Sequence, residues 1–317
     1  MTSEPPASGV IRPPEVTIVI PAFRHPERLR VCLEALVRQD YPTELLTVVI
    51  VDDGSPQPLE TVCSQFTDRL RLRVHRQSNA GPAVARNVGA GLACGALLAF
   101  TDDDCEPEPG WVAALAAAHT AYPQAAIGGA VVNALPEQRC AEASHMLQDF
   151  LYEWFTPDAP SRFFASNNLA MPRQDFQEVG GFDTTFPRPG GEDRELCERW
   201  SHGGRPLVEA SAAVVRHSHS MGMGGFCRQH WNYGRGAYIV RRRRLAFAAV
   251  NARVRVEPAS FYIALMTRPF GRTPLRSAVP LVALLGISQV ANAAGFFFEV
   301  FSQSLEHLPV PSQAGGR

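Results

Sequence analysis

The chain contains no lysine, so all 30 of its basic residues are arginines. A Walker A phosphate loop, a protein-kinase nucleotide site and an enzyme that works through a Schiff base each require a lysine side chain. The absence of lysine therefore excludes these three classes of protein. A bias in codon usage explains the composition most simply, and we assign no function to the absence itself.

The seven cysteines form no CxxC pair, and their number is odd. We interpret them as reduced thiols of a cytoplasmic protein, rather than as a disulfide framework or a zinc site. The N-terminal residues lack a basic stretch followed by an apolar core, so we expect no signal peptide. We predict a cytoplasmic location, either free in solution or at the cytoplasmic face of a membrane.

A strong excess of charge is also absent, because the net charge of the 317 residues is -1 at pH 7. A generic nucleic-acid binder would carry an excess of positive charge, so we expect no nucleic-acid partner. The hydrophobic fraction of 45% is sufficient for a large buried core. The length suits one large domain, or one domain with an appendage.

Apolar β-branched runs alternate with amphipathic segments in the first third of the chain. The expected strands there are residues 16–20, 46–51, 70–75 and 97–100, and the expected helices are residues 26–39, 59–66 and 81–94. This alternation is typical of an α/β fold with a doubly wound, mostly parallel sheet. Further along, the pattern predicts helices at 110–122, 141–155, 194–202 and 225–244 and strands at 126–132, 163–171 and 212–215.

Two of the expected strands end in aspartates, at Asp52–Asp53 and at Asp102–Asp104. The carboxyl ends of parallel strands share one edge of the sheet, where open α/β sheets bind ligands. Adjacent carboxylates repel one another unless a cation lies among them, and Mg2+ or Mn2+ would suit their oxygens. A solvated acidic loop is the alternative. Neither strand is followed by GxGxxG, which argues against a dinucleotide cofactor.

A cation is expected at the same edge of the sheet. The helix predicted from residue 81 presents the positive end of its dipole there, and Arg86 adds a fixed charge. Arg86 could bind phosphates or pair with one of the aspartates, and the two roles are compatible.

Seven short motifs follow one another along the chain. They are VIPAF at 19–23, VDDGS at 51–55, NxGxxxARNxG at 79–89, FTDDDCxP at 100–107, SNN at 166–168, GGFD at 180–183 and GED at 191–193. In their order and spacing they resemble the family 2 glycosyltransferases, over residues 16–245. The resemblance implies a GT-A fold and an inverting enzyme that uses a nucleotide sugar.

The resemblance also implies residue roles on the donor side. The nucleotide-binding residues would be Pro21, Asp52, Asp53, Arg86, Asp102 and Asp103. Asp53 would contact the base. The Mg2+ or Mn2+ cofactor would be bound by Asp102, Asp104 and His217, with His219 as the alternative histidine. A structural histidine at a strand end is the other interpretation of His217.

On the acceptor side, Asp193 would be the general base, and Asn167, Asn168 and Glu192 would contact the acceptor. A cap at a helix N-terminus is the alternative role for Asp193. Residues 227–231, CRQHW, resemble only weakly the Gln-x-x-Arg-Trp motif of processive members. We therefore expect the transfer of a single sugar.

The expected partners are a nucleotide-sugar donor, a UDP-sugar by the habit of the family, and an acceptor that is an envelope glycan or a lipid-linked saccharide. Two other functions were weighed. A catalytically silent nucleotide-binding or scaffold protein with this fold stays open. A phosphotransferase with an aspartyl nucleophile is disfavoured, because that class needs a lysine near the phosphate.

The C-terminal part differs in character. Residues 278–298 form an uncharged run of 21 residues, long enough to span a bilayer, beside a stretch rich in arginine. A membrane span, peripheral membrane contact and a soluble helix hairpin all fit this pattern. The expected organisation is a flexible tail at 1–14, a GT-A domain at 15–245 and a helical extension at 246–317, with the domain divided into a nucleotide-binding half at 15–108 and an acceptor half at 109–245.

Overall fold

The computed structural model describes residues 12–155, 162–186, 189–247 and 257–306. Most of the expected tail, residues 1–11, lies outside this range. The strands are β1 Val16–Ala22, β2 Leu46–Asp52, β3 Arg71–Arg76, β4 Leu97–Phe100, β5 Cys105–Pro107, β6 Ala126–Asn133, β7 Leu169–Pro172 and β8 Leu207–His217. The helices are α1 Pro26–Val37, α2 Glu60–Cys63, α3 Pro82–Gly91, α4 Trp111–Ala121, α5 Arg139–Trp154, α6 Arg173–Val179, α7 Glu192–His202, α8 Met223–Phe247, α9 Ala259–Arg272 and α10 Leu275–Glu306.

The strands form one sheet in the order β3-β2-β1-β4-β7-β6-β8-β5. The first four run parallel, since β1 pairs in parallel with both β2 and β4, and β2 with β3. The other half is mixed, because β7 is antiparallel to both β4 and β6, whereas β6 and β8 are parallel. Both aspartate clusters therefore lie at the same edge of the sheet, as the sequence predicted. The α/β class is confirmed.

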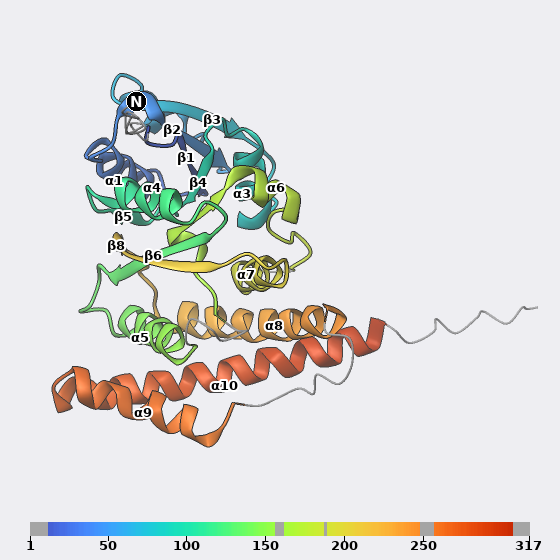
Figure 1. The fold of residues 1–317 in the computed structure, drawn as a ribbon. Helices are drawn as coiled ribbons and strands as arrows, with labels where there is room; N and C mark the ends of the chain where they lie inside the picture. Colours follow the sequence, from blue (N-terminus) through green and yellow to red (C-terminus); the bar gives the residue numbers. More distant parts are fainter. Residues whose placement is uncertain (1–11, 156–161, 187–188, 248–256, 307–317) are drawn as a thin grey trace, which may run out of the picture.

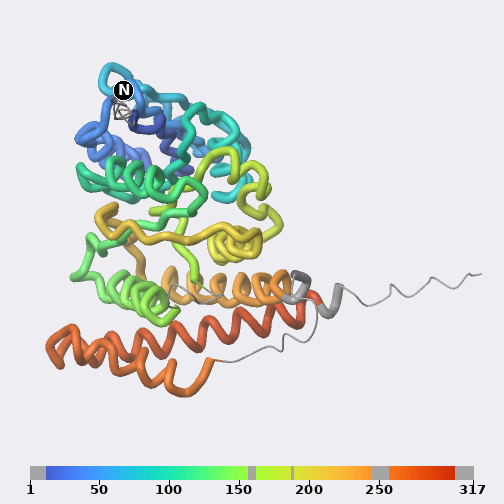
Figure 2. The backbone as a smooth tube through the Cα atoms, in the orientation of Figure 1, coloured from blue at the N-terminus to red at the C-terminus, as the bar shows by residue number. Residues whose placement is uncertain are grey.

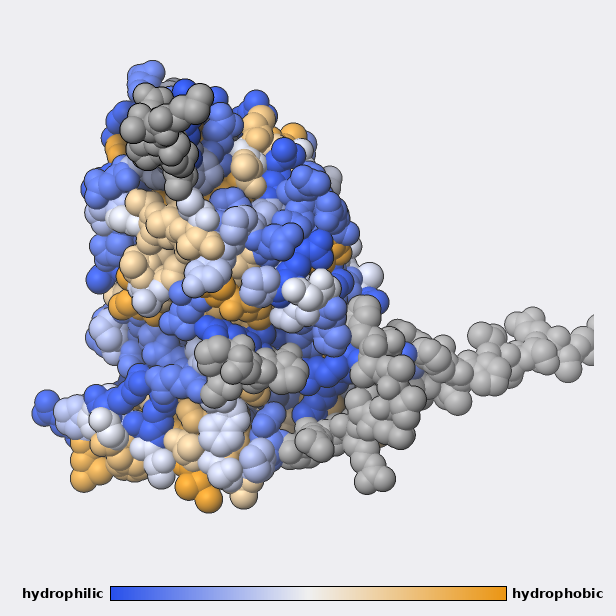
Figure 3. All heavy atoms as spheres, viewed as in Figure 1, coloured by the Kyte–Doolittle hydropathy of each residue, from blue (hydrophilic) through white to orange (hydrophobic). Residues whose placement is uncertain are grey.

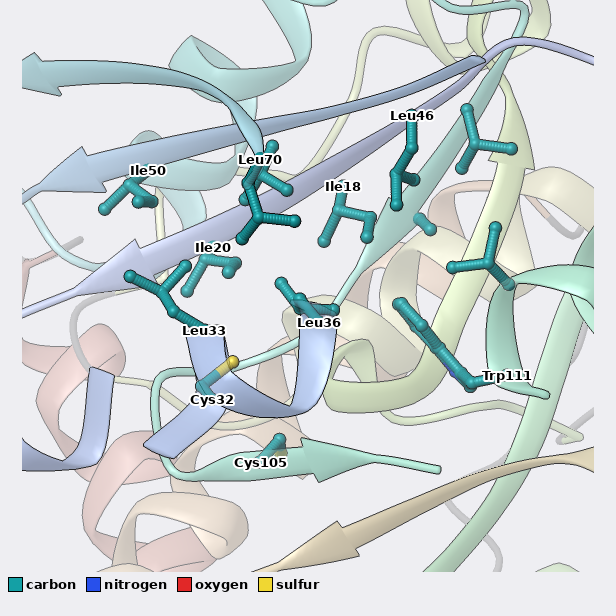
Figure 4. Close-up of a cluster of buried hydrophobic side chains, with 14 of the residues drawn as sticks. Ile18, Ile20, Cys32, Leu33, Leu36, Leu46, Ile50, Leu70, Cys105 and Trp111 are labelled. Carbon is teal, nitrogen blue, oxygen red and sulfur yellow. The ribbon is translucent and has the colours of Figure 1, made fainter. Parts of the chain in front are cut away.

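The parallel half is buried on both faces, which explains its continuous apolar runs. On β1, Ile18 and Ile20 face the cluster that includes side chains of α1 and Trp111 of α4 (Figure 4). Val19 points the other way, toward side chains of α6 and α7 such as Phe176. Trp111 is fully buried, in agreement with a packing role.

Three local predictions were wrong. Residues 166–168 form a 3-10 turn ahead of β7 instead of a strand, α6 was missed, and β8 begins at Leu207, five residues before its predicted start at 212. Strand β8 has a register shift where it pairs with Gly129 and Ala130 of β6, so its apolar alternation is broken. The start and register of β8 depend on pairing with distant strands, which local pattern does not contain.

The C-terminal helices form a separate layer below the sheet. Helices α9 and α10 make a hairpin that packs beneath α5 and α8 (Figures 1 and 2). The shared core contains Phe150 of α5, Phe226 of α8, Phe261 of α9 and Leu285 of α10. By length and composition only, residues 275–303 of α10 could cross a membrane, and 28% of the most apolar part is buried within the protein.

Candidate active site

An open cleft of about 1290 Å3 lies between the carboxyl edge of the sheet and the layer of α5, α7 and α8. Its upper wall comes from the ends of β1 and β4, the loop after β2 and the first turn of α3. Its lower wall comes from α5, the start of α7 and one side of α8. The candidate residues that line it are Pro21, Asp53, Arg86, Asp102, Asp103, Asp104, Asn167, Glu192, Asp193, His217 and His219.

Asp53 sits on the loop that joins β2 to α2. Its carboxylate accepts hydrogen bonds from the backbone N–H groups of Ala80 and Gly81, at 2.8 and 2.9 Å, and from the side chain of Gln77 at 2.8 Å. The loop turns at Gly54, whose φ of 78° favours glycine, and a Cβ there would lie 2.7 Å from the backbone nitrogen of Asn79. The sequence thus folds VDDGS and NxG into one rigid wall of the cleft.

Asp52, which was predicted to contact the nucleotide, has a different position from its neighbour. Its side chain is fully buried and does not line the cleft. The carboxylate accepts from the backbone N–H of Ser55 at 2.9 Å and from the Arg76 guanidinium at 2.8 Å. Asp52 holds the loop that carries Asp53.

Asp104 lies between two imidazoles. Its carboxylate oxygens are 3.2 Å from Nε2 of His217 and 3.2 Å from Nδ1 of His219, and the two rings stack at 5.3 Å. Burial alone would raise the pKa of Asp104, but the hydrogen bonds and charges of the two histidines hold it well below its usual range. Donor atoms from these three residues lie within 4.8 Å of one another, a spacing that fits a metal ion. Both candidate histidines thus contact the same carboxylate.

Asp102, the other half of the expected Asp102/Asp104 pair, does not join this group among the described residues. Instead, Asp102 Oδ1 accepts from the Arg86 guanidinium at 2.6 Å, and Glu192 Oε1 lies 3.9 Å from the other terminal nitrogen of Arg86. Burial opposes the charge of Arg86, but Asp102 and Glu192 outweigh it and raise the pKa. Nε and Nη1 of Arg86 are buried without a hydrogen-bond partner, so this cation retains donors for a ligand.

Asp103 is the middle carboxylate of the acidic turn. Burial and the charges of Asp104 and Asp102 raise its pKa to about 7, against a hydrogen bond from the backbone N–H of Phe23 at 3.3 Å. Pro21 lies at the end of β1 beside the same turn, paired with Val51. Both residues line the donor side of the cleft.

Asp193 lies in the first turn of α7, on the opposite wall. The preceding Gly191 has a φ of 105°, which lets the chain turn sharply into the helix. One oxygen of Asp193 accepts from the backbone N–H of Arg194 at 2.7 Å, and the other from that of Ser166 at 3.4 Å. Burial and the charge of Glu192 raise the pKa of Asp193 to about 6, which suits a base that works near neutral pH.

The two predicted asparagines occupy different positions relative to the cleft. Asn167 lines the cleft, and its buried Oδ1 has no hydrogen-bond partner. Asn168, the other residue predicted to contact the acceptor, does not line the cleft. It accepts from Trp111 Nε1 at 2.8 Å and donates to the backbone oxygens of Ala130 and Ala213, and these bonds join α4 to β6 and β8.

The prediction missed His230 on α8. Its ring lies against Phe226, its exposed fraction is 1%, and neither ring nitrogen has a hydrogen-bond partner. Burial lowers its pKa to about 4, so the ring is neutral at pH 7. His230 lines the cleft together with Asn167. It stands inside the weakly matching CRQHW segment, which was the only signal in the sequence.

The fold and the cleft define a nucleotide-sugar transferase architecture, and the comparisons agree. Residues 17–180 match the model of glycosyl transferase family 2, and residues 149–221 match one described as an N-terminal domain of galactosyltransferase. The first match spans more than half of the chain. The chain belongs to the family 2 glycosyltransferases.

Among curated relatives, validoxylamine A glucosyltransferase of Streptomyces hygroscopicus subsp. jinggangensis is 32% identical over 224 residues, which is 62% of this chain and 53% of that protein. Pre-mycofactocin glycosyltransferase of Mycobacterium tuberculosis is 30% identical over 213 residues, 65% of this chain and 43% of that protein. The chain therefore spans about half the length of these relatives.

Among solved structures, the mannosyltransferase PcManGT from Pyrobaculum calidifontis, in complex with GDP-Man and Mn2+, has a TM-score of 0.64 at 16% identity and covers 92% of this chain and 89% of its own. S. aureus TarS 1-349 in complex with UDP-GlcNAc has a TM-score of 0.51 at 15% identity and covers 93% of each chain. At these identities the likeness concerns the fold, and it confirms the GT-A architecture.

Proposed function

We propose that this chain transfers a single sugar from a nucleotide-sugar donor to a hydroxyl of an acceptor, with inversion at the anomeric carbon and with a divalent metal ion. The observation that carries the proposal is the composition of one cleft. A rigid loop with Asp53, a donor set of Asp104 and two histidines, and Asp193 with a raised pKa all face it.

On the donor side, Asp53 would accept hydrogen bonds from the nucleotide base, and the UDP-sugar is the proposed donor. The free N–H donors of Arg86 would bind the diphosphate or the sugar near it. Asp102 would keep Arg86 in place and approach the sugar from the same side. Pro21 and Asp103 complete this wall of the cleft.

The residues that would hold the metal are Asp104, His217 and His219. A carboxylate with two imidazoles suits Mn2+ better than Mg2+, because Mg2+ prefers an all-oxygen shell. When bound, the ion would neutralise the charge that develops on the nucleoside diphosphate as it leaves. Stabilising that charge is the largest contribution that such a site makes to the rate.

The acceptor side is built around Asp193. Its carboxylate would take the proton of the acceptor hydroxyl as that oxygen attacks the anomeric carbon, and the carbon–oxygen bond to the diphosphate breaks in the same displacement. One displacement inverts the centre and needs no carboxylate nucleophile. Glu192, fixed by the backbone N–H of Gly190 at 2.7 Å, would keep the pKa of Asp193 raised.

The acceptor would lie along α5 and α8. Asn167 and His230 offer buried hydrogen-bonding atoms without a partner, and sugar hydroxyls satisfy such atoms well. We propose an envelope glycan or a lipid-linked saccharide as the acceptor, with peripheral contact of the C-terminal region at the cytoplasmic face of the membrane. A silent nucleotide-binding protein remains the second candidate.

The first test is a thermal-shift panel of UDP, GDP, dTDP and CDP, each with and without Mn2+. A ligand that binds only the folded state raises its stability by mass action. We expect a shift for one nucleotide that grows with Mn2+, and release of that nucleotide from its sugar donor in the presence of acceptor extracts. A shift without turnover would favour the silent protein, and no shift for any nucleotide would refute the donor site.

A further inference from the structure

The outer face of α10 is apolar along most of its length. Between residues 279 and 301 every exposed residue of the helix is apolar, namely Val279, Ala283, Ile287, Val290, Ala293, Ala294, Phe297, Phe298 and Phe301. They recur every three or four positions and so form one stripe along the helix. At 1.5 Å per residue the stripe is about 33 Å long. On the antiparallel neighbour α9, Tyr262, Ile263 and Phe270 are also exposed.

These side chains together are named the apolar face of the hairpin. Figure 3 shows hydrophobic residues gathered along the lower edge of the molecule, over the α9–α10 hairpin. A surface helix of a soluble protein usually has the opposite polarity, with its polar side facing water. A continuous exposed apolar surface of this kind marks a site of contact with a partner or a membrane.

The inner face of α10 carries buried polar groups, one of which binds α8. Ser288 is fully buried and donates to the Leu285 carbonyl of its own helix, whereas Glu299, exposed by only 4%, pairs with Arg235 of α8 at 2.7 Å. Two glycines bring the helix backbones close together. A Cβ at Gly234 would lie 1.9 Å from the Asn292 carbonyl oxygen, and one at Gly295 would lie 2.0 Å from that of Trp231.

These contacts decide how the helix can meet a bilayer. To span it, α10 would have to leave α8, breaking the Arg235–Glu299 ion pair and exposing the Glu299 carboxylate to lipid. Lying flat on the surface, it keeps every inner contact and buries only the outer stripe. The geometry therefore favours a helix in the plane of the interface.

The charges around the apolar face indicate which lipid head groups it would bind. Among the described side chains of α9 and α10, the exposed charged residues are Arg272 and Arg276. On α8, Arg242 and Arg243 are also exposed. Arg272 pairs with Glu153 at 2.7 Å and Arg243 with Asp183 at 2.8 Å, so among the described residues Arg242 and Arg276 are the cations of this rim without an acidic partner. Two copies of the chain facing each other would bring cationic rims together, whereas anionic lipid head groups would neutralise them.

We propose that the apolar face of the hairpin binds peripherally to an anionic lipid bilayer, with α10 parallel to the membrane plane. Asn292 of the same helix lines the active-site cleft, so docking would bring the bilayer close to the acceptor side. This link to a lipid-linked acceptor rests on the proposed function. The docking itself does not depend on turnover.

The experiment is cosedimentation of the purified full chain with vesicles of phosphatidylcholine that contain about one third phosphatidylglycerol, compared with phosphatidylcholine alone. The test variant carries both Val290→Glu and Phe297→Glu. These side chains are 71% and 57% exposed, so the substitutions are compatible with folding. The matched control is Leu92→Glu with Tyr122→Glu, which adds the same charge at exposed apolar residues of the upper layer.

We expect binding to the anionic vesicles, weaker binding to phosphatidylcholine, and a loss of at least about tenfold in the test variant, with the control within about twofold of the native chain. Equal binding of the test and control variants would overturn the proposal. So would a dimer in solution that the test variant converts to a monomer without any vesicle binding. Resistance of the membrane-bound protein to alkaline carbonate would show a span instead. Donor turnover by each variant in detergent-free buffer tests the proposed function separately.

Discussion

Asp193→Asn tests the assignment of the base most directly. Asparagine keeps the size of the side chain and can accept the hydrogen bond from the Arg194 N–H, but it cannot take a proton from an acceptor hydroxyl. Loss of a general base lowers a rate by about 100- to 10,000-fold. We expect a fall of this size in kcat, measured as sugar transfer or as donor hydrolysis with water in place of the acceptor, and little change in donor KM.

The pH dependence of the native enzyme gives the second part of this prediction. Because burial and Glu192 raise the pKa of Asp193 to about 6, the carboxyl is protonated and inactive below that pH. The rate should therefore rise tenfold per pH unit up to about pH 6 and then level off. If the base were an ordinary aspartate with a pKa of 3.8, this rise in rate would end about two pH units lower. A rate that stays level down to pH 4.5 would refute the reasoning.

The same raised pKa predicts a gain in stability. A carboxyl whose pKa is higher in the folded state than in the unfolded state loses stability for the fold as it becomes charged. Above about pH 6 Asp193 is charged in both states, and the full cost of its buried charge then destabilises the fold. A rise from 3.8 to about 6 corresponds to at most about 3 kcal/mol, so Asp193→Asn should be at least as stable as the native chain at pH 7.5, though almost inactive. The control is Glu195→Gln, on the same helix, where Glu195 pairs with Arg199. This variant should lose stability, and its rate should still rise with pH up to about pH 6.

Three other substitutions separate the remaining parts of the site. Asp104→Ala should abolish turnover and remove the effect of Mn2+ on the nucleotide thermal shift, and unchanged turnover would exclude the metal assignment. Asp52→Asn should lower the free energy of unfolding by about 2–4 kcal/mol in a denaturant titration. The buried carboxylate accepts three hydrogen bonds, and the amide that replaces it has an NH2 group that can only donate. Unchanged stability would contradict the structural role of Asp52. His230→Ala should raise the acceptor KM about tenfold and leave donor hydrolysis unchanged, and a loss of both would instead indicate a structural histidine.

The sequence was sufficient for the parts of the fold that rest on local pattern. The apolar runs at β1, β2 and β4 predicted a parallel sheet because strands buried on both faces need continuous hydrophobic residues. The motifs also placed most candidate residues in one cleft. The sequence could not show which charged side chains pair inside the cleft. The approach of Arg86 to Asp102, for example, depends on how α3 meets the end of β4. The pairing of His219 with Asp104 likewise spans 115 positions.

The separation of Asp52 from Asp53 follows from the two-residue period of a strand. On β2, Val48 and Ile50 face the core that contains α1, whereas Val49 and Val51 face the other side. Asp52 comes two residues after Ile50 and continues the same buried face, so its carboxylate must find partners inside the protein. Asp53 follows the strand end and is turned toward the cleft by the chain reversal at Gly54. Applied to DD pairs at strand ends, this alternation distinguishes the carboxylate that builds the loop from the one that is available to a ligand.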